Sequence, residues 1–277
     1  MTTALAPLHP KELAPSRLPA RTDAQALVHV EDLTMAYGEN VLQHDLNFDI
    51  RSGEVFVIVG GSGCGKSTLL RHLVGLQAPA KGRVLYGQRD LYDSDDATLS
   101  ALRREFGVSF QAGALWSSMT VGENVMLPLQ MFTELDAQAR ESEARFKLAL
   151  AGLPDSFDSE PSALSGGMKK RAAIARALAL DPALLFLDEP SAGLDPISSA
   201  HLDELLAHLC HDLGTTVVMV SHELDSIFSV ADRVLFLDAQ SKTMTALGPP
   251  RELQRSGPKH VRDFLRHGGN NATGSGP

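Results

Sequence analysis

A glycine-rich run that closes on a lysine and a serine is the feature of the sequence most specific to one chemistry. It matches the pattern Gly-x-x-x-x-Gly-Lys-Ser/Thr at every position: Gly60, Gly61, Ser62, Gly63, Cys64, Gly65, Lys66 and Ser67. Glycines let the backbone curl so that its N–H groups face one point, and a following helix adds positive charge there. The run therefore predicts a polyphosphate cradle. Lys66 is placed to reach the β- and γ-phosphates, Ser67 to bind Mg²⁺, and Thr68 to contact the α-phosphate.

Two other interpretations of this run are open. It could be a chance glycine-rich turn, but the apolar strand before it and the helix after it disfavour that alternative. Cys64 could be a redox switch, because a helix N-terminus can lower the pKa of a thiol. We favour Cys64 as a small space-filling residue, since its position in the pattern accepts any side chain.

Two acids end an apolar stretch, which is unusual for a buried strand. Leu184 to Leu187 is followed directly by Asp188 and Glu189. Asp188 is expected to act on Mg²⁺, either directly or through the second coordination shell. Glu189 is then placed to orient and polarise an attacking water as a general base, a role worth ~10²–10⁴-fold in rate. Taken alone, this strand end would simply be a pair of solvated acids.

Two further polar residues follow predicted strands. His222 lies just past the apolar stretch Thr215–Ser221, where its imidazole could hydrogen-bond the γ-phosphate and hold Glu189 and the water. Gln111 follows Val108–Phe110 and could touch both Mg²⁺ and the water. Most of the ten histidines are better explained as ordinary core or surface residues.

Length and composition limit the function classes. The chain has 277 residues, of which 43% are hydrophobic and 21% charged, as in a soluble globular protein with one large α/β domain. The net charge of −9 disfavours nucleic acid as the main partner. No apolar run approaches the ~18–20 residues that span a bilayer. Two cysteines and the lack of a signal-peptide pattern predict a cytoplasmic location.

Alternating elements predict a parallel sheet covered on both faces. Strands are expected up to Gly38 and over 46–50, 55–59, 83–86, 184–187 and 215–220, with a helix over about 66–76. The region 112–164 is mainly helical. In it, Glu141/Arg145 and Glu143/Lys147 are i,i+4 pairs, Gly152 could end the helix, and Phe146, Leu150 and Leu153 are predicted to form its inward stripe.

A second motif, together with the phosphate-binding run, resembles the ABC ATPase family. It is Leu164-Ser165-Gly166-Gly167-Met168 at the start of a helix. The resemblance implies a P-loop NTPase with a mainly parallel sheet, an antiparallel β subdomain and an inserted helical subdomain, working with ATP and Mg²⁺. It also implies a homodimer with two sandwiched ATP molecules, in which Ser165, Gly166 and Gly167 meet the γ-phosphate held by the partner's P-loop.

Other family elements occur in the same order. Tyr37 is similar to the aromatic residue that stacks on adenine, with a half-buried strand tyrosine as the alternative. Gln111 matches the loop that joins the core to the helical subdomain, and Ser191–Asp195 matches the segment that communicates across the dimer. The resemblance covers about 27–250, with the helical subdomain at about 112–170. We expect a flexible leader over 1–26, a C-terminal helical extension over 251–267, in which Val261, Phe264 and Leu265 form a short amphipathic helix, and a disordered tail over 268–277.

One departure points to a branch of the family. Met168 stands where the usual signature has Gln, which resembles the Mla-type ATPases that serve MCE-domain lipid transporters. That branch implies phospholipid transport, a membrane permease, an MCE-domain protein, a small STAS-domain subunit, and a peripheral position on the cytoplasmic face of the inner membrane. Lys169 and Lys170 are best explained as solvated helix charges. Apolar residues after Gln111 could dock the permease or belong to the subdomain core: Ala114, Leu115, Trp116 and Met119.

Three alternatives have different functional consequences. An ATPase of a polar-solute importer, such as one for amino acids, would share all the motifs, and only Met168 speaks against it. A non-transport ABC protein of DNA repair, chromosome structure or translation would usually need a coiled-coil insertion, zinc cysteines or a second ATPase domain. A scaffold without catalysis is disfavoured because every catalytic position is filled.

Overall fold

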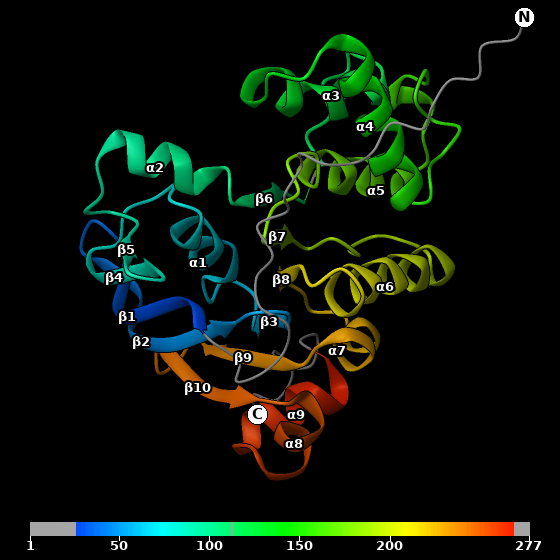
Figure 1. The fold of residues 1–277 in the computed structure, drawn as a ribbon. Coiled ribbons are helices and arrows are strands. Elements are labelled where there is room, and N and C mark those ends of the chain that lie inside the picture. The colour runs from blue at the N-terminus through cyan, green and yellow to red at the C-terminus, as the bar shows by residue number, and fades with distance from the viewer. Residues whose placement is uncertain (1–25, 112, 269–277) are drawn as a thin grey trace, which may run out of the picture.

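The computed structural model describes residues 26–111 and 113–268, which form two sheets flanked by helices (Figure 1). The central sheet has the order β10-β9-β3-β8-β7-β6. All neighbouring strands in it are parallel except β10, which is antiparallel to β9. Its strands are β3 (Val55–Gly60), β6 (Phe106–Ser109), β7 (Leu184–Asp188), β8 (Thr216–Val220), β9 (Arg233–Asp238) and β10 (Thr243–Gly248). The expected mainly parallel sheet is confirmed.

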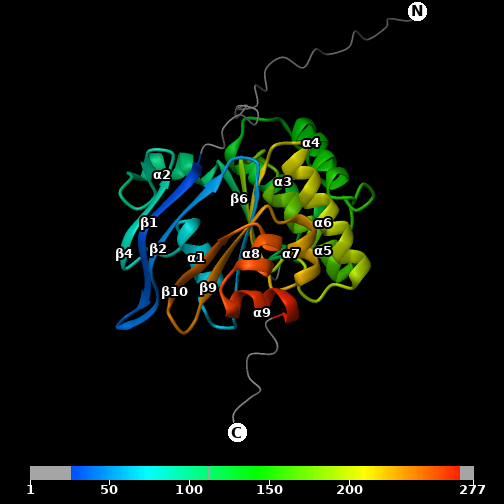
Figure 2. The same ribbon diagram turned by 90° about the horizontal axis from the view of Figure 1, so that it is seen from below.

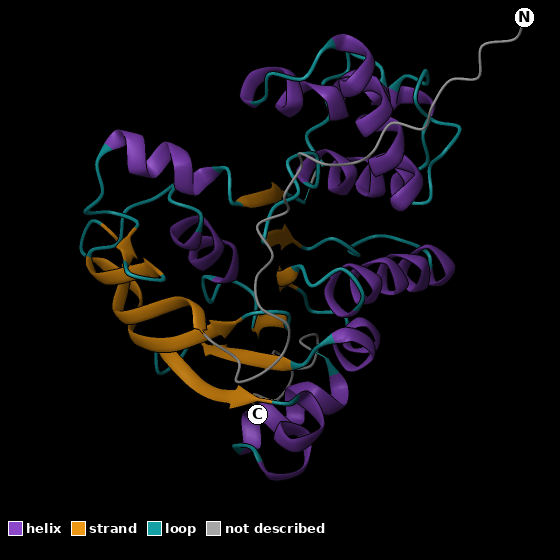
Figure 3. Ribbon diagram, viewed as in Figure 1, coloured by secondary structure: helices purple, strands orange, loops and turns teal. Residues whose placement is uncertain are grey.

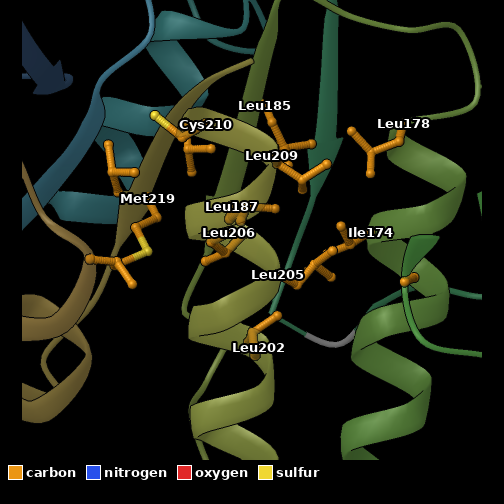
Figure 4. Close-up of a cluster of buried hydrophobic side chains, with 14 of the residues drawn as sticks. Ile174, Leu178, Leu185, Leu187, Leu202, Leu205, Leu206, Leu209, Cys210 and Met219 are labelled. Carbon is orange, nitrogen blue, oxygen red and sulfur yellow. The ribbon is translucent and has the colours of Figure 1, made fainter. Parts of the chain in front are cut away.

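Helices cover both faces of this sheet (Figure 3), and the strands β3, β7 and β8 in its middle are buried at every position for that reason. In β3, Val57 belongs to the hydrophobic cluster that includes α6 (Pro196–His211) and α7 (Leu224–Val230), whereas Ile58 belongs to the cluster that includes α1 (Lys66–Leu73). Figure 4 shows four leucines of α6 beside the strand residues Leu185 and Leu187: Leu202, Leu205, Leu206 and Leu209. The central strand is therefore buried on two sides.

The second sheet, with the order β2-β1-β4-β5, packs over the α1 side of the core. It is the predicted antiparallel subdomain, and its strands are β1 (Ala26–Tyr37), β2 (Asn40–Arg51), β4 (Lys81–Tyr86) and β5 (Arg89–Asp90). Asp32 and Asp45 have φ angles of 46° and 53° and mark register shifts in the β1–β2 pair. The Asn47 amide fixes the first of them by donating to Asp32 Oδ1 at 2.9 Å and accepting from Asp32 N at 2.9 Å.

Two helices differ in detail from the sequence-based expectation. Helix α1 ends at Leu73, three residues before the predicted end, because Gly75 adopts a φ of 71° and Leu76 N bonds back to Arg71 O. Helix α2 (Asp96–Arg103), which precedes β6, was not predicted.

The region between β6 and β7 forms a helical lobe (Figure 1). It contains α3 (Val121–Phe132), α4 (Ala137–Leu150), a 3₁₀ turn (Pro161–Ala163) and α5 (Gly166–Ala177). Both predicted ion pairs of α4 are confirmed, Glu141–Arg145 at 2.8 Å and Glu143–Lys147 at 2.8 Å. Gly152, with a φ of 70°, follows the end of α4 as expected.

The predicted inward stripe of α4 is wrong at Phe146. Its side chain is 57% exposed, while Ala144 and Leu148 are fully buried. Leu153 is buried but lies beyond the helix, which ends at Leu150. The buried face of α4 consists of Ala144, Lys147 and Leu148, a small residue, a charged residue and one leucine, so large apolar residues at helical spacing do not mark it.

Two short helices end the described chain, α8 (Pro250–Ser256) and α9 (Lys259–His267). They pack together below β9 and β10 in Figure 1, and Figure 2 shows them from that side. The predicted amphipathic helix is confirmed, since Val261, Phe264 and Leu265 are all buried. Phe264 contacts Phe236 of β9 edge to face, with ring centroids 5.2 Å apart. The predicted leader and tail fall on residues outside the described ranges, apart from Ala26 and Gly268 at their borders.

Strand β6 and the end of α5 approach each other closely. A Cβ atom on Gly107 would lie 2.2 Å from Ala177 O, so no larger residue fits without a shift. Within the described residues, no helix combines the length and hydropathy needed to cross a bilayer.

Candidate active site

The glycine-rich loop lies between the central strand β3 and helix α1, and two of its glycines have φ angles and neighbours that disfavour a side chain. Gly60 has a φ of 151°, and a Cβ on it would lie 2.3 Å from Leu237 O. Gly65 has a φ of 100°, and a Cβ on it would lie 3.2 Å from Met35 Cε. These constraints curl the loop at the N-terminus of α1, where a helix favours anions.

Lys66 folds back over this loop. Its Nζ donates to Gly60 O and Gly61 O, each at 3.0 Å. The ammonium therefore lies beside the turn whose N–H groups are expected to hold phosphate.

Cys64 is buried within the loop, and burial raises the pKa of its thiol. A raised pKa disfavours the thiolate, so the structure supports the space-filling role over the redox switch. The Cys64 carbonyl is held from the neighbouring sheet by Gln43, whose Nε2 donates to Cys64 O at 2.8 Å and to Asp238 O at 3.0 Å. No pattern in the sequence indicated that this glutamine is fully buried.

Ser67 and Asp188, the residues of two separate motifs that are expected to bind Mg²⁺, lie side by side. Ser67 Oγ, at the start of α1, donates to Asp188 Oδ1 at 2.8 Å. Asp188 ends β7 and is buried. A hydroxyl and a carboxylate side by side are the hard oxygen donors that Mg²⁺ prefers, so these residues fit that ion.

Glu189 and His222 also come together, from the ends of neighbouring strands β7 and β8. Glu189 Oε2 lies 2.7 Å from His222 Nδ1. The glutamate side chain is 12% exposed and the imidazole 53% exposed. Glu189 has a φ of 51°, a backbone conformation that is uncommon for a residue with a side chain. The imidazole of His222 thus holds the carboxylate of Glu189 at the end of β7.

Gln111 lies just past β6, and its side chain is exposed. Ser109 pairs with Leu187 in the parallel β6–β7 ladder, so Gln111 and Asp188 follow the same edge of the sheet. That edge also carries the glycine-rich loop at the end of β3.

Tyr37 and Thr68 lie together on the other side of the loop. The Tyr37 hydroxyl donates to Gln77 Oε1 at 3.1 Å, and a hydrogen bond with the Thr68 side chain is the main cause that lowers the pKa of Tyr37. Tyr37 is exposed at the end of β1, next to α1. Its ring is therefore accessible for stacking on a base.

The Ser-Gly-Gly motif is not brought to the loop of the same chain. It lies in the helical lobe, at the start of α5, while the loop lies in the core between β3 and α1 (Figure 1). Ser165 caps α5 by accepting from Met168 N at 3.2 Å. Ser165 and Gly166 are exposed, and Gly167 packs against Ser198, where a Cβ would lie 3.1 Å away.

Asp195 caps helix α6. Its Oδ1 accepts from Ile197 N at 3.1 Å and Ser198 N at 3.0 Å, and Ser198 Oγ donates to its Oδ2 at 2.6 Å. These bonds, led by that of the Ser198 hydroxyl, lower the pKa of Asp195. If Asp195 makes the predicted contact across a dimer, it must do so with a carboxylate that already caps α6.

The prediction that Lys170 is a solvated helix charge is wrong. Its ammonium is partly buried and donates to Glu189 O at 3.2 Å and to Ala192 O. Burial lowers the pKa of Lys170, while the carboxylates of Glu223 and Glu189 act in the opposite direction. No pattern in the sequence distinguished it from Lys169.

Comparisons with known proteins agree with this geometry. A family model described as ABC transporter matches residues 43–192. The methionine import ATP-binding protein MetN of Xanthomonas oryzae pv. oryzae is 44% identical over 225 residues, which cover 80% of this chain and 65% of MetN. The intermembrane phospholipid transport system ATP-binding protein MlaF of Escherichia coli is 37% identical over 239 residues, which cover 86% of this chain and 88% of MlaF. The dimeric structure of MJ0796, a bacterial ABC transporter cassette, has a TM-score of 0.73 at 32% identity and covers 80% of this chain and 98% of its own.

Proposed function

Because this chain belongs to the ABC transporter family, we propose that it binds and hydrolyses ATP to drive a separate membrane permease. One observation carries the proposal. The pairs Ser67–Asp188 and Glu189–His222 meet along one edge of the parallel sheet, beside a glycine-rich loop that opens a helix. This edge is where α/β sheets bind their ligands.

Each residue has a separate task in the proposed reaction. The loop amides and Lys66 bind the phosphates, and Ser67, Asp188 and Gln111 would hold Mg²⁺, which supplies positive charge against the phosphate oxygens. Glu189 accepts a proton from the attacking water as the water oxygen bonds to the γ-phosphorus and the bond from that phosphorus to the β–γ bridging oxygen breaks, which leaves ADP and inorganic phosphate. The imidazole of His222 holds the Glu189 carboxylate in the orientation that this transfer needs.

The exposed Ser165 and Gly166 support a two-fold dimer. They lie at a helix N-terminus, away from the loop of their own chain, and are free to meet a γ-phosphate held by a second copy. In this arrangement ATP joins the two subunits, and loss of the γ-phosphate lets them separate. The segment after Gln111 would pass this motion to the permease.

We propose phospholipid as the cargo, with an MCE-domain protein and a small STAS-domain subunit as further partners. Met168 and the likeness to MlaF, which extends over 88% of that protein, support this substrate. The complex would place the chain on the cytoplasmic face of the inner membrane. A methionine-type importer is the second candidate, favoured by the 44% identity with MetN.

Purification of the intact complex from membranes tests the cargo. We expect the tagged chain to bring down a permease together with an MCE-domain protein, and mass spectrometry of the extracted complex to find phospholipid above the level in a mock purification. A complex that instead contains a solute-binding receptor would contradict the lipid proposal and support the importer. Nucleotide hydrolysis is not at issue in this measurement, because both candidates need it.

Trp116 is the proposed anchor for the permease. Its side chain is 58% exposed, whereas its backbone is fixed by Asn124, whose Oδ1 accepts from Trp116 N at 2.8 Å. Arg176 holds the preceding residues by donating to Ala114 O at 2.8 Å. An exposed aromatic ring on a segment whose backbone is held by hydrogen bonds is suited to be an interface hot spot. Leu115, in contrast, packs against the hydrophobic core.

We therefore expect the Trp116→Ala variant to recover about 10-fold less permease, or even less, during purification. Its own affinity for ATP should be unchanged. The matched control is Phe146→Ala, which removes a ring of similar exposure from α4. Equal recovery of permease with the Trp116 variant and the natural chain would show that docking occurs elsewhere.

A further inference from the structure

Lys170 binds the backbone of the turn that follows the proposed general base. Its Nζ donates to the carbonyl oxygens of Glu189 and Ala192, the first and last residues of that turn. The turn itself is closed by Ala192 N, which donates to Glu189 O at 3.3 Å. One ammonium group therefore connects both ends of the turn to helix α5.

This contact bears on where Glu189 points. The φ of 51° at Glu189 is disfavoured for a residue with a Cβ atom, so surrounding contacts must maintain it. His222 fixes the carboxylate of Glu189, and Lys170 fixes its carbonyl. A displacement of about 1 Å in a catalytic group can reduce the rate ~10²-fold.

We propose that Lys170 is a positioning residue that holds Glu189 in its reactive orientation and couples the two nucleotide sites of the dimer. The coupling follows from α5: Ser165 lies at its start and would face the partner's ATP in the proposed dimer, while Lys170 on the same helix holds the turn of the proposed base for the chain's own ATP. This inference rests on the proposed function. Binding of ATP at one site would thus favour the correct placement of Glu189 at the other.

The test uses the full-length chain with Lys170→Met, which keeps the length of the side chain but removes its charge and donors. We expect kcat for ATP hydrolysis to fall about 10- to 100-fold, because hydrogen bonds from a charged group to the turn are lost. The Kd for ATP should stay within about twofold, and the Hill coefficient of hydrolysis should fall toward that of independent sites. Lys170→Arg, which keeps a charged donor, should recover most of both quantities.

The neighbouring lysine provides a matched control. Lys169→Met removes an equal charge one residue away and should leave kcat and the Hill coefficient as they are. The proposal is overturned if Lys170→Met keeps the natural kcat, if Lys169→Met is equally impaired, or if Lys170→Arg is no better than Lys170→Met. If thermal melting shows that the methionine variant does not fold, Lys170→Gln is measured instead, and a natural kcat and Hill coefficient in it overturn the proposal.

Failure of this inference can be separated from failure of the proposed function. A natural chain that does not hydrolyse ATP, or one whose hydrolysis is insensitive to Glu189→Gln, contradicts the proposed function itself. A natural chain that hydrolyses ATP and responds to Glu189→Gln, but not to Lys170→Met, rejects only the role of Lys170.

Discussion

The Glu189→Gln variant is expected to bind ATP like the natural chain but to hydrolyse it ~10²–10⁴-fold more slowly, since the amide cannot accept a proton from water. The substitution keeps the size of the side chain and a carbonyl oxygen able to accept from His222 Nδ1, which lies 2.7 Å from the carboxylate. The local structure should therefore survive. Because ATP then persists at both interfaces, closed dimers should accumulate.

Two measurements check this expectation. Steady-state phosphate release gives the rate, and light scattering after size-exclusion chromatography with ATP and magnesium gives the dimer fraction. Glu204→Gln is the control, because it removes an exposed carboxylate from α6. A Glu189 variant that turns over ATP at the natural rate would falsify the general-base assignment, and one that is slow yet monomeric with ATP would reject the two-copy arrangement.

The Lys66→Ala variant should lose ATP affinity by about 10- to 100-fold, the effect expected when a charge-assisted hydrogen bond of ~1.5–3 kcal/mol is removed. Lys66 is half-buried and its Nζ donates to the loop carbonyls of Gly60 and Gly61, so the fold should tolerate the loss of this side chain. Hydrolysis at ATP concentrations near the natural Kd should fall by at least the same factor.

Equilibrium binding of a fluorescent ATP analogue measures this loss, and a thermal melt confirms that the variant is folded. Lys81→Ala removes an exposed lysine from β4 and serves as the control. Natural affinity in the Lys66 variant would contradict the assignment of the phosphate-binding loop.

The polar strand ends could be predicted because the strand and its functional residues lie in the same short segment of sequence. Leu184–Leu187 followed by Asp188 and Glu189 identified β7 and its polar end, and parallel pairing then brought that end to the edge reached by β8 and His222. The parallel sheet and the C-terminal helix followed from similar local patterns, whereas the antiparallel subdomain followed from the resemblance to the ABC ATPase family. Local patterns sufficed wherever one segment contained both the element and its functional residue.

The inward position of Gln43 could not be predicted, because a bulge changes the alternation of its strand. Phe48 and Leu46 point into the core, but Asp45 adopts a φ of 53° and the register with β1 shifts, so the next buried residue is Gln43 instead of His44 or Leu42. Simple alternation places Gln43 outside. The bulge depends on pairing with β1, which the sequence of β2 does not contain.

The predictions for Lys170 and Phe146 were wrong for a related reason. Hydropathy assigns a lysine to solvent and a phenylalanine to the core, yet Lys170 reaches two carbonyls of another loop and Phe146 lies outside, with its ring centroid 5.1 Å from Lys147 Nζ. Both outcomes depend on which elements α5 and α4 meet. In α4 the buried face even includes Lys147, whose ammonium pairs with Asp181 at 2.6 Å, so neither the size nor the hydropathy of a residue indicates that face.

The close approach of Gly107 to Ala177 has a mechanical consequence. Because a Cβ atom on Gly107 would lie 2.2 Å from the Ala177 carbonyl oxygen, strand β6 and the C-terminal end of α5 approach more closely than any side chain at this position would allow. The start of α5 is held as well, since Gly167 packs against Ser198 and Lys170 donates to Glu189 O. A rotation of the helical lobe that leaves the Gly107–Ala177 contact in place would therefore have to change the contacts at the start of α5, next to Ser165.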